Sequence, residues 1–209
     1  MLVGTEEMMS ILSSYGLKFT GALHVGAHEC EELAFYIRLG LKPTDVVWID
    51  AMENKVAEAT ARGIPNVYQA VVTDKDDAPV TFNVTNNVQS SSVLEFGTHA
   101  THHPHVVMVE KKTLQTTTLD TFLARRGLDA TKMEFWNFDI QGAELLALQG
   151  GEKALAHAKA VYLEVNAEEV YKGCATIPQL DAFLGAHGFI RVRTAMTPYG
   201  WGDALYIRM

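Results

Sequence analysis

Two acids, Asp50 and Asp139, each end a run of apolar residues that is typical of a buried strand. The runs cover residues 45–50 and 135–139, and a tight Gln141–Gly142 turn follows the second. Open α/β sheets bind their ligands at the carboxyl ends of such strands. A carboxylate at this place can bind hydroxyl groups, hold a cation or take a proton, or it can simply cap the following helix.

A glycine turn at Gly26 precedes Asp50 by 24 residues. An acid about 20 residues after a strand–glycine turn is placed to bind the ribose hydroxyls of a nucleotide-like cofactor. The second and third glycines of the dinucleotide fingerprint are absent, which argues against a nicotinamide-dependent oxidoreductase. His24 and His28 flank the turn, where each can contact a ligand or serve packing and capping.

Further polar residues allow two other chemistries. Asp139, Glu164 and Asn166 end neighbouring strands and can hold Mg²⁺, although their spacing fixes no coordination geometry. The segment 98–105 contains four histidines, among them His102 and His103. Structural zinc usually has cysteine partners or a helix or hairpin spacing, so we expect no metal there. This loop is instead interpreted as an active-site lid or substrate wall, with His102 and His103 as candidate bases.

The elements that must position these residues alternate between strand and helix. Strands are expected at 22–25, 45–50 and 67–72, with helices at 33–39 and 53–62 between them. This order implies a parallel sheet with right-handed crossovers. After the helix that starts near 143, strands at 159–166, 189–192 and 204–207 complete the sheet, and the last two form an antiparallel hairpin. In its loop, Tyr199 and Trp201 can stack on a ring-shaped acceptor or simply cover the sheet.

The domain organisation follows from the same pattern. Residues 1–20 are expected to form an N-terminal helical extension, and residues 21–209 a single domain. The region of about 80–117 is an insertion with predicted strands at 80–84, 106–109 and 114–117. Thr118 is expected to cap the helix that follows this insertion.

Composition excludes several classes. Apolar residues make up 48% of the 209 residues and the formal net charge is −8. This charge, without a basic cluster, argues against a nucleic-acid partner. No apolar run reaches membrane-spanning length and no leader is recognisable, so we expect no membrane partner. With only two cysteines, Cys30 and Cys174, the sequence indicates a reducing, cytoplasmic location.

The order of motifs resembles the FkbM family of S-adenosylmethionine-dependent methyltransferases. The motifs are the strand–glycine loop, the acid Asp50, Ser90–Ser92, Thr118–Asp120 and the block Asp139–Leu145. The likeness covers about His24 to Ile207. This chain departs from the family pattern in the first loop, where His24 replaces Asp, His28 replaces Asn and Cys30 replaces Gly. It also carries Asn137 where the family often has Lys, and Gln141 where it has Glu.

The resemblance implies a class I methyltransferase fold: an α/β, Rossmann-like, mostly parallel sheet with its first and fourth strands adjacent at the topological switch point. It implies S-adenosylmethionine as cofactor, with Asp50 on the ribose and Asp139 at the reacting end. The implied cofactor-binding residues are His24, Gly26, Ala27, His28, Asp50, Ala51, Ala70, Ser91, Asp139 and Gln141. Asp139, His102, His103 and Glu164 are the candidate catalytic residues.

The resulting hypothesis is an O-methyltransferase for a hydroxyl of a sugar, a glycan or a small natural product. Methyl transfer is an in-line displacement, so alignment of the reacting atoms dominates, and a hydroxyl acceptor benefits from a positioned base. The alternative is a catalytically silent module that binds S-adenosylmethionine or a partner with the same fold. The altered first loop keeps this alternative open, because a fold does not by itself imply activity.

Overall fold

The computed structural model describes residues 1–209, and its centre is a seven-stranded sheet of order β3-β2-β1-β7-β8-β10-β9. The first five of these strands run parallel, and β10 is antiparallel to both of its neighbours. The strand order reverses between β1 and β7, which confirms the expected switch point and the antiparallel C-terminal hairpin. The strands are β1 (Ala22–Val25), β2 (Val46–Asp50), β3 (Val67–Gln69), β7 (Phe135–Phe138), β8 (Ala160–Asn166), β9 (Phe189–Met196) and β10 (Trp201–Arg208).

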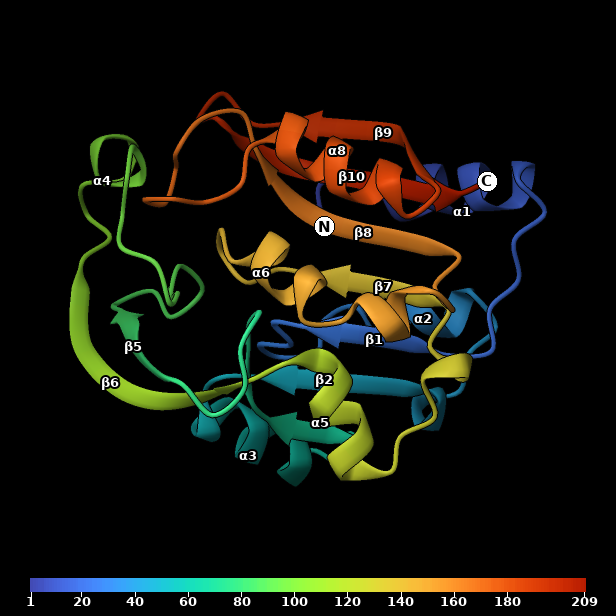
Figure 1. The fold of residues 1–209 in the computed structure, drawn as a ribbon, viewed down its shortest axis with the longest axis horizontal. Helices are drawn as coiled ribbons and strands as arrows, with labels where there is room; N and C mark the ends of the chain where they lie inside the picture. Colours follow the sequence, from blue (N-terminus) through green and yellow to red (C-terminus); the bar gives the residue numbers. More distant parts are fainter.

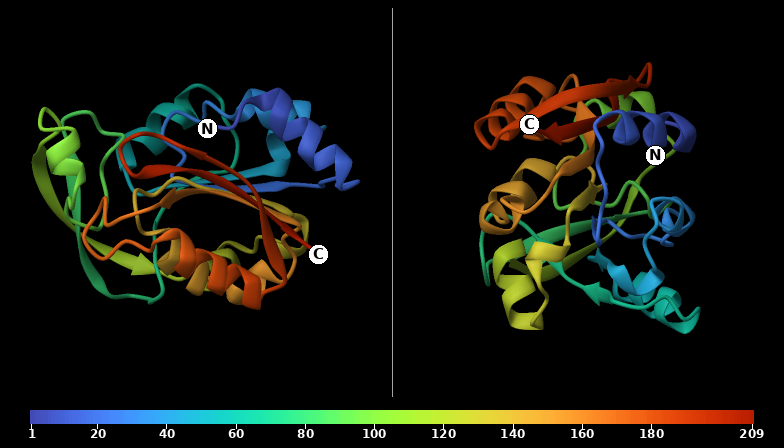
Figure 2. Two further views of the ribbon diagram at one scale, coloured as in Figure 1. Left: turned by 90° about the horizontal axis from the view of Figure 1, so that it is seen from above. Right: turned by 90° about the vertical axis from the view of Figure 1, so that its right-hand side faces the viewer.

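Helices cover both faces of this sheet (Figure 2). On one face, α1 (Thr5–Ser14), α2 (Leu33–Arg38) and α3 (Glu53–Ala61) contribute to a core cluster of 17 buried residues. The other face carries a larger cluster of 25 buried residues. It is covered by α5 (Leu119–Arg126), α6 (Glu144–Gln149), α7 (Glu152–Leu155) and α8 (Ile177–Ala186), and the short turns η1 (Pro43–Asp45) and η2 (Ala130–Lys132) complete the domain. Because apolar layers lie above and below, β1 and β7 are buried at all positions and are apolar except for one polar residue each, His24 and Asn137.

The insertion forms a second, three-stranded sheet from β4 (Val71–Val72), β6 (Met108–Thr117) and β5 (Pro79–Thr85). It lies on the side toward which the arrowheads of β2, β7 and β8 point (Figure 1). The four-histidine segment contains a single helical turn, α4 (His99–His102). The expected helix cap is confirmed, since the Thr118 hydroxyl accepts the Thr121 N–H.

Two strand predictions in this region were wrong. Residues 67–72 are not one strand: β3 pairs with β2, whereas β4 pairs with β6 in the second sheet. The Ala70 N–H still bonds to the Asp50 carbonyl, and the chain then leaves the central sheet. Residues 106–109 and 114–117 belong largely to one continuous strand, β6. Its middle is polar because it is exposed to solvent, and this polar stretch suggested a break.

The N-terminal segment packs onto the domain. Val3, Met8 and Leu12 are buried in the same cluster as Leu205 and Ile207 of β10. Glu7 on α1 also pairs with Arg193 of β9 at 2.6 Å. The division into an extension of residues 1–20 and a domain of residues 21–209 stays a prediction. None of the helices in the chain has the length and apolar character needed to cross a bilayer.

Candidate active site

A cavity of about 590 Å³ lies at the carboxyl ends of the parallel strands, between the central sheet and the insertion. This volume is in the range of small-molecule sites. Most residues expected at the site line it: His24, Gly26, His28, Asp50, Ala51, Ala70, Ser91, His103, Asp139, Gln141 and Glu164. Ala27, His102 and Asn166 do not. The topology therefore brings together strand-end residues that are far apart in the sequence.

Asp50 is held by backbone donors at the end of β2. Its Oδ2 accepts the His28 N–H at 2.8 Å, and its Oδ1 accepts the Met52 N–H at 2.7 Å. Burial raises the pKa of this carboxyl, while the two backbone hydrogen bonds act in the opposite direction. Each oxygen keeps a further lone pair, so a half-buried carboxylate in this position can accept two vicinal hydroxyls of a ribose.

Gly26 is required for a reason that the sequence did not reveal. Its φ is +90°, and a Cβ at this position would lie 1.9 Å from the carbonyl oxygen of Asp139. The glycine therefore allows β1 and β7 to meet at the switch point, in addition to lining the cavity. The N–H groups of Gly26 and Ala27 both bond to the Ile49 carbonyl, at 2.8 and 3.0 Å. This loop thus fixes the turn with its amides and does not direct them into the cavity.

His24 is a buried, neutral residue on β1. It stacks on Trp48 with ring centroids 4.9 Å apart, and its Nδ1 lies 2.9 Å from the Tyr36 hydroxyl. Burial lowers the pKa of His24 to about 3. Asn137 is its register partner on β7 and donates to the same hydroxyl at 3.2 Å. Two departures from the family pattern, His24 for an acid and Asn137 for a base, are therefore adjacent and both neutral.

Gln141 connects three parts of the site. Its side-chain nitrogen donates to Asp139 Oδ1 at 2.6 Å and to Glu164 Oε2 at 2.7 Å, and its Oε1 accepts the Tyr171 hydroxyl at 2.5 Å. Its backbone carbonyl accepts the Ser92 hydroxyl at 2.8 Å. A glutamate here would be a third carboxylate beside Asp139 and Glu164, whereas the amide can donate to both.

The carboxyl groups around Gln141 are hard to ionise. The Asp139 side chain is in contact with solvent in the cavity, but most of its surroundings are protein atoms. The resulting desolvation raises its pKa to about 6, and the hydrogen bond from Gln141 acts in the opposite direction. Burial and then the charges of Glu144 and Asp139 raise the pKa of Glu164 well above its usual range. Burial also raises the pKa of Glu144 to about 7, although its carboxylate accepts the Ile140 and Gly142 N–H groups. At pH 7 Asp139 is therefore mostly ionised, whereas burial among like charges favours the neutral form of Glu164.

The proposed magnesium ligands do not form a cluster. Asn166 is fully buried and outside the cavity lining, and the Gln141 N–H group lies between Asp139 and Glu164. No group of three His, Cys, Asp or Glu side chains is arranged to hold a metal ion. An amide donor between two carboxylates fits a hydrogen-bonded site better than a cation site.

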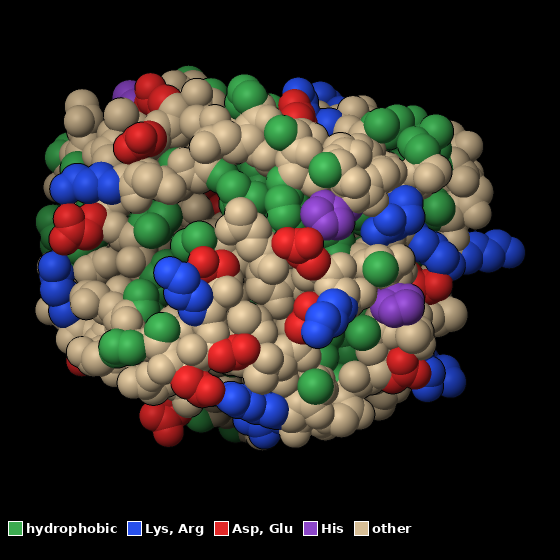
Figure 3. Space-filling model, viewed as in Figure 1, with side chains coloured by type: hydrophobic (Ala, Val, Ile, Leu, Met, Phe, Trp, Pro, Cys, Tyr) green, Lys and Arg blue, Asp and Glu red, His purple; other side chains and the backbone are tan.

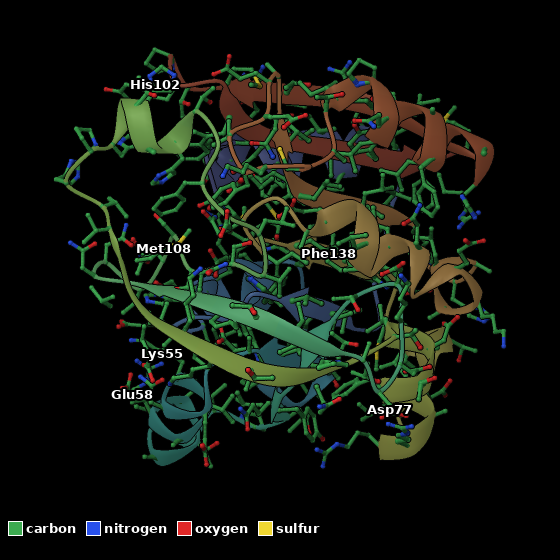
Figure 4. All side chains as sticks on the ribbon, turned by 60° about the vertical axis from the view of Figure 1, so that its left-hand side comes forward. Lys55, Glu58, Asp77, His102, Met108 and Phe138 are labelled. Carbon is green, nitrogen blue, oxygen red and sulfur yellow. The ribbon has the colours of Figure 1, made fainter.

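The histidines of the insertion separate into two groups. His102 lies at the outer end of α4 (Figure 4), where its Nε2 is 3.5 Å from Glu168, and it does not line the cavity. His103 lines the cavity and packs against Tyr199 with ring centroids 4.7 Å apart. His99 and His105 also line it, and the sequence analysis did not single them out. The 3.6-residue period places His99 and His103 on one face of a helical turn, but α4 was not predicted.

Other residues of the site also escaped sequence reasoning. Tyr171 and Asp203 line the cavity, as do Met1 and Leu2 of the N-terminal segment. Asp203 accepts the Leu2 N–H at 2.5 Å and the Tyr162 hydroxyl. Asp203 follows Trp201 by two residues in the sequence, so its type and its place in the predicted hairpin loop could be read there. Its position next to Glu164 depends on the β8–β10 register, which the sequence does not show.

Comparison with known structures identifies the class of fold. Streptococcus pneumoniae Sp1610, assigned as a tRNA (m1A22) methyltransferase, has 13% identity and a TM-score of 0.50, with 97% of this chain and 71% of that chain covered. An S-adenosylmethionine-dependent methyltransferase from Aquifex aeolicus has 15% identity and a TM-score of 0.46, with coverages of 100% and 91%. Magnesium protoporphyrin IX methyltransferase from Synechocystis PCC 6803, solved with bound S-adenosylmethionine, has 12% identity and a TM-score of 0.45, with coverages of 98% and 78%. At these identities the likeness concerns the fold, which is that of class I methyltransferases.

The family follows from the sequence match. The model of the methyltransferase FkbM domain matches residues 24–191, and the chain therefore belongs to the FkbM methyltransferase family. No curated protein matches the chain. The protein is accordingly an S-adenosylmethionine-dependent methyltransferase. The cavity fits such a cofactor, because Asp50 can accept ribose hydroxyls and the acid-rich lining suits a sulfonium cation.

Proposed function

We propose that the protein is an O-methyltransferase that acts on a hydroxyl group of a sugar, a glycan or a small natural product. The observation that carries this proposal is the Asp139 carboxylate, which faces the cavity with a pKa of about 6. A hydroxyl is a poor nucleophile, and a base whose pKa lies close to the working pH assists it best. Asp139 is ionised at neutral pH and can accept the hydroxyl proton as the new O–C bond forms.

The neighbouring groups position this base. Gln141 donates to Asp139 Oδ1 and leaves the other oxygen, Oδ2, without a side-chain partner. Glu164 is held on the same amide, and its raised pKa favours the neutral form, which can donate a hydrogen bond to the acceptor. We assign His103 to the acceptor wall, and give His102 no direct role because it lies outside the cavity.

The cofactor supplies an electrophilic methyl group when it is bound. We propose that Asp50 binds its ribose, with Ala51, Ala70 and Ser91 forming the adjacent walls. Gly26 and Ala27 shape this end through the backbone turn, and His24 and His28 support it from the side of β1. The displacement releases no charge into the site, because the cationic donor becomes neutral as the hydroxyl loses its proton to Asp139. Fixed dipoles that need no reorganisation during the reaction favour such a step.

Calorimetry with S-adenosylmethionine and S-adenosylhomocysteine tests the first half of this proposal. Transfer of a labelled methyl group to a panel of glycosides, polyols, phenols and amines tests the second half. We expect binding of both cofactor forms and transfer to hydroxyl acceptors. Exclusive transfer to amines would overturn the O-methyltransferase assignment. Binding without transfer to any member of a broad panel would favour the silent module instead.

A further inference from the structure

We propose that the part of the cavity between β8 and β10 selects an uncharged, hydroxyl-bearing ring as acceptor and rejects anionic molecules. This inference rests on the proposed function and specifies its acceptor. The cavity runs along the strand ends in the order β2, β1, β7, β8 and β10. Asp50 on β2 and Asp203 on β10 are separated by four strand spacings, or roughly 19 Å. With the cofactor assigned to the β1–β2 end, the β8–β10 end is left for the acceptor.

Most charged side chains that line the cavity are negative. The cavity wall contains six carboxylate residues and no arginine, and its cations are one lysine and the terminal ammonium of Met1, which lies 4.0 Å from Glu32. The lysine, Lys55, lies beside Glu58 on α3 (Figure 4), and its Nζ is 3.1 Å from the carboxylates of both Glu58 and Glu29. No salt bridge to Lys or Arg involves Asp139, Glu164 or Asp203. An anion at this end would therefore meet more carboxylates than cations, and both cations of the lining already face carboxylates.

Glu164 and Asp203 form the floor of this acceptor end. They are direct partners in the β8–β10 register, and both side chains are more than nine-tenths buried. The donors near Asp203 are already used, because Leu2 and Tyr162 donate to it. The Asp203 carboxylate therefore offers a ligand only acceptor capacity, which hydroxyl groups can satisfy by donating. A carboxylate or a phosphodiester has no hydrogen to donate and adds a like charge.

The other walls are flat and aromatic. Tyr171, Trp201 and His99 line the same end of the cavity. Tyr171 and His99 have ring centroids 5.5 Å apart, and burial lowers the pKa of His99 to about 4, so this imidazole is neutral. Aromatic surfaces around a ring of acceptor oxygens are suited to the apolar face and hydroxyl edge of a sugar or a similar ring.

The same charge argument separates this protein from methyltransferases of nucleic acids. Two like charges about 5 Å apart at the effective dielectric of a protein surface cost roughly a 300-fold loss of affinity before screening by salt. Phosphate backbones are bound through clusters of Lys and Arg. The face shown in Figure 3 instead mixes Lys and Arg with Asp and Glu, without a basic patch.

Two probes that differ at one position test this inference. The probes are 4-nitrophenyl β-D-glucopyranoside and 4-nitrophenyl β-D-glucuronide, whose binding is measured by calorimetry and saturation-transfer NMR on protein saturated with S-adenosylhomocysteine. We expect the neutral glucoside to bind at least 30-fold more tightly than the glucuronide. The ratio should shrink as the salt concentration rises, because part of the repulsion is screened. Equal affinity, tighter binding of the glucuronide, or no binding of either probe would overturn the inference.

A variant pair locates the effect. Asp203→Asn keeps an oxygen acceptor for Leu2 and Tyr162 but removes the charge, and it should reduce the ratio to below about 10-fold. Asp77→Asn removes the same charge on the exposed loop between β4 and β5, where Asp77 pairs with Arg125 outside the cavity, and should leave the ratio unchanged. An unchanged ratio in Asp203→Asn would contradict the assignment. Failure of S-adenosylhomocysteine to bind would contradict the proposed function itself. Binding of S-adenosylhomocysteine without discrimination between the two probes would contradict this inference alone.

Discussion

The two ends of the cavity hold their acids in different ways. At the β1–β2 end, backbone N–H groups of His28 and Met52 bind the Asp50 carboxylate. At the β7–β8–β10 end, the acids are held mainly by side chains. Gln141 donates hydrogen bonds to Asp139 and Glu164, and the Tyr162 hydroxyl donates to Asp203. Backbone donors are present whatever the neighbouring side chains are, so the orientation of the Asp50 carboxylate depends mainly on the fold. The second end depends on the identity of a few residues, and specificity can therefore change there without loss of the fold.

The largest expected effect comes from Gly26, where both ends depend on the approach of β1 to β7. In Gly26→Ala the new Cβ would be placed 1.9 Å from the Asp139 carbonyl oxygen, in a backbone with φ +90°. We expect the free energy of unfolding to fall by at least about 3 kcal/mol, together with loss of cofactor binding. Thermal unfolding and calorimetry measure both.

Gly40→Ala is the matched control for this change. Gly40 has nearly the same φ, +89°, but nothing lies within 4 Å of its added Cβ. It should cost about 1 kcal/mol from backbone strain alone and leave cofactor binding intact. Similar losses in both variants would show that strain, and not the contact between β1 and β7, makes Gly26 necessary.

Asp50 gives the next largest effect and separates the two ends. Asp50→Ala removes the acceptor for the ribose and leaves the His28 and Met52 N–H groups without their partner. We expect S-adenosylmethionine to bind about 100-fold more weakly, as is typical for loss of charged hydrogen bonds. Affinity for the glucoside probe, measured on variant protein fully saturated with S-adenosylhomocysteine, should stay unchanged. Calorimetric affinity within threefold of the wild type would disprove the ribose assignment.

The sequence predicted the backbone-built end well because its signals are local. A strand, a glycine turn and an acid at the next strand end follow within one stretch, and Asp50 and Gly26 line the cavity as expected. Predictions for the other end were less complete, because it is assembled from distant segments. Neither the Asp203–Glu164 register nor the packing of Leu2 against Asp203 leaves a periodic pattern. His102 was selected by residue type, but its place at the outer end of α4 depends on a helical turn too short to predict.

Turnover should depend on pH through the ionisation of Asp139. Its pKa is raised to about 6, mainly by desolvation and further by the Asp203 and Glu32 charges, so the carboxyl is protonated at pH 5 and ionised at pH 7. If it is the base, turnover of the best acceptor should rise with pH and reach half its maximum near pH 6. Glu144, with a pKa of about 7, and Glu164 also face this group, and ionisation of Glu144 would push the midpoint upward.

Asp139→Asn tests this assignment directly. Turnover should fall about 100-fold, a typical contribution of a general base, and the inflection near pH 6 should disappear. S-adenosylmethionine affinity at pH 7 should change much less than in Asp50→Ala. A variant that keeps the inflection would show that another group, for example His103, takes the proton.

The smallest effect is expected at Tyr162, whose hydroxyl donates to Asp203 and accepts the Val3 N–H at 3.2 Å. Tyr162→Phe should lower the free energy of unfolding by about 1 kcal/mol, as expected for loss of a buried hydrogen bond. It should also weaken binding of the glucoside probe a few-fold, because Asp203 is no longer held in place. Tyr206→Phe is the control, since Tyr206 donates to Asp181 at 2.8 Å and lies outside the cavity. It should cost similar stability without affecting the probe, and equal effects of the two variants on probe binding would mean that the Tyr162 hydroxyl serves stability alone.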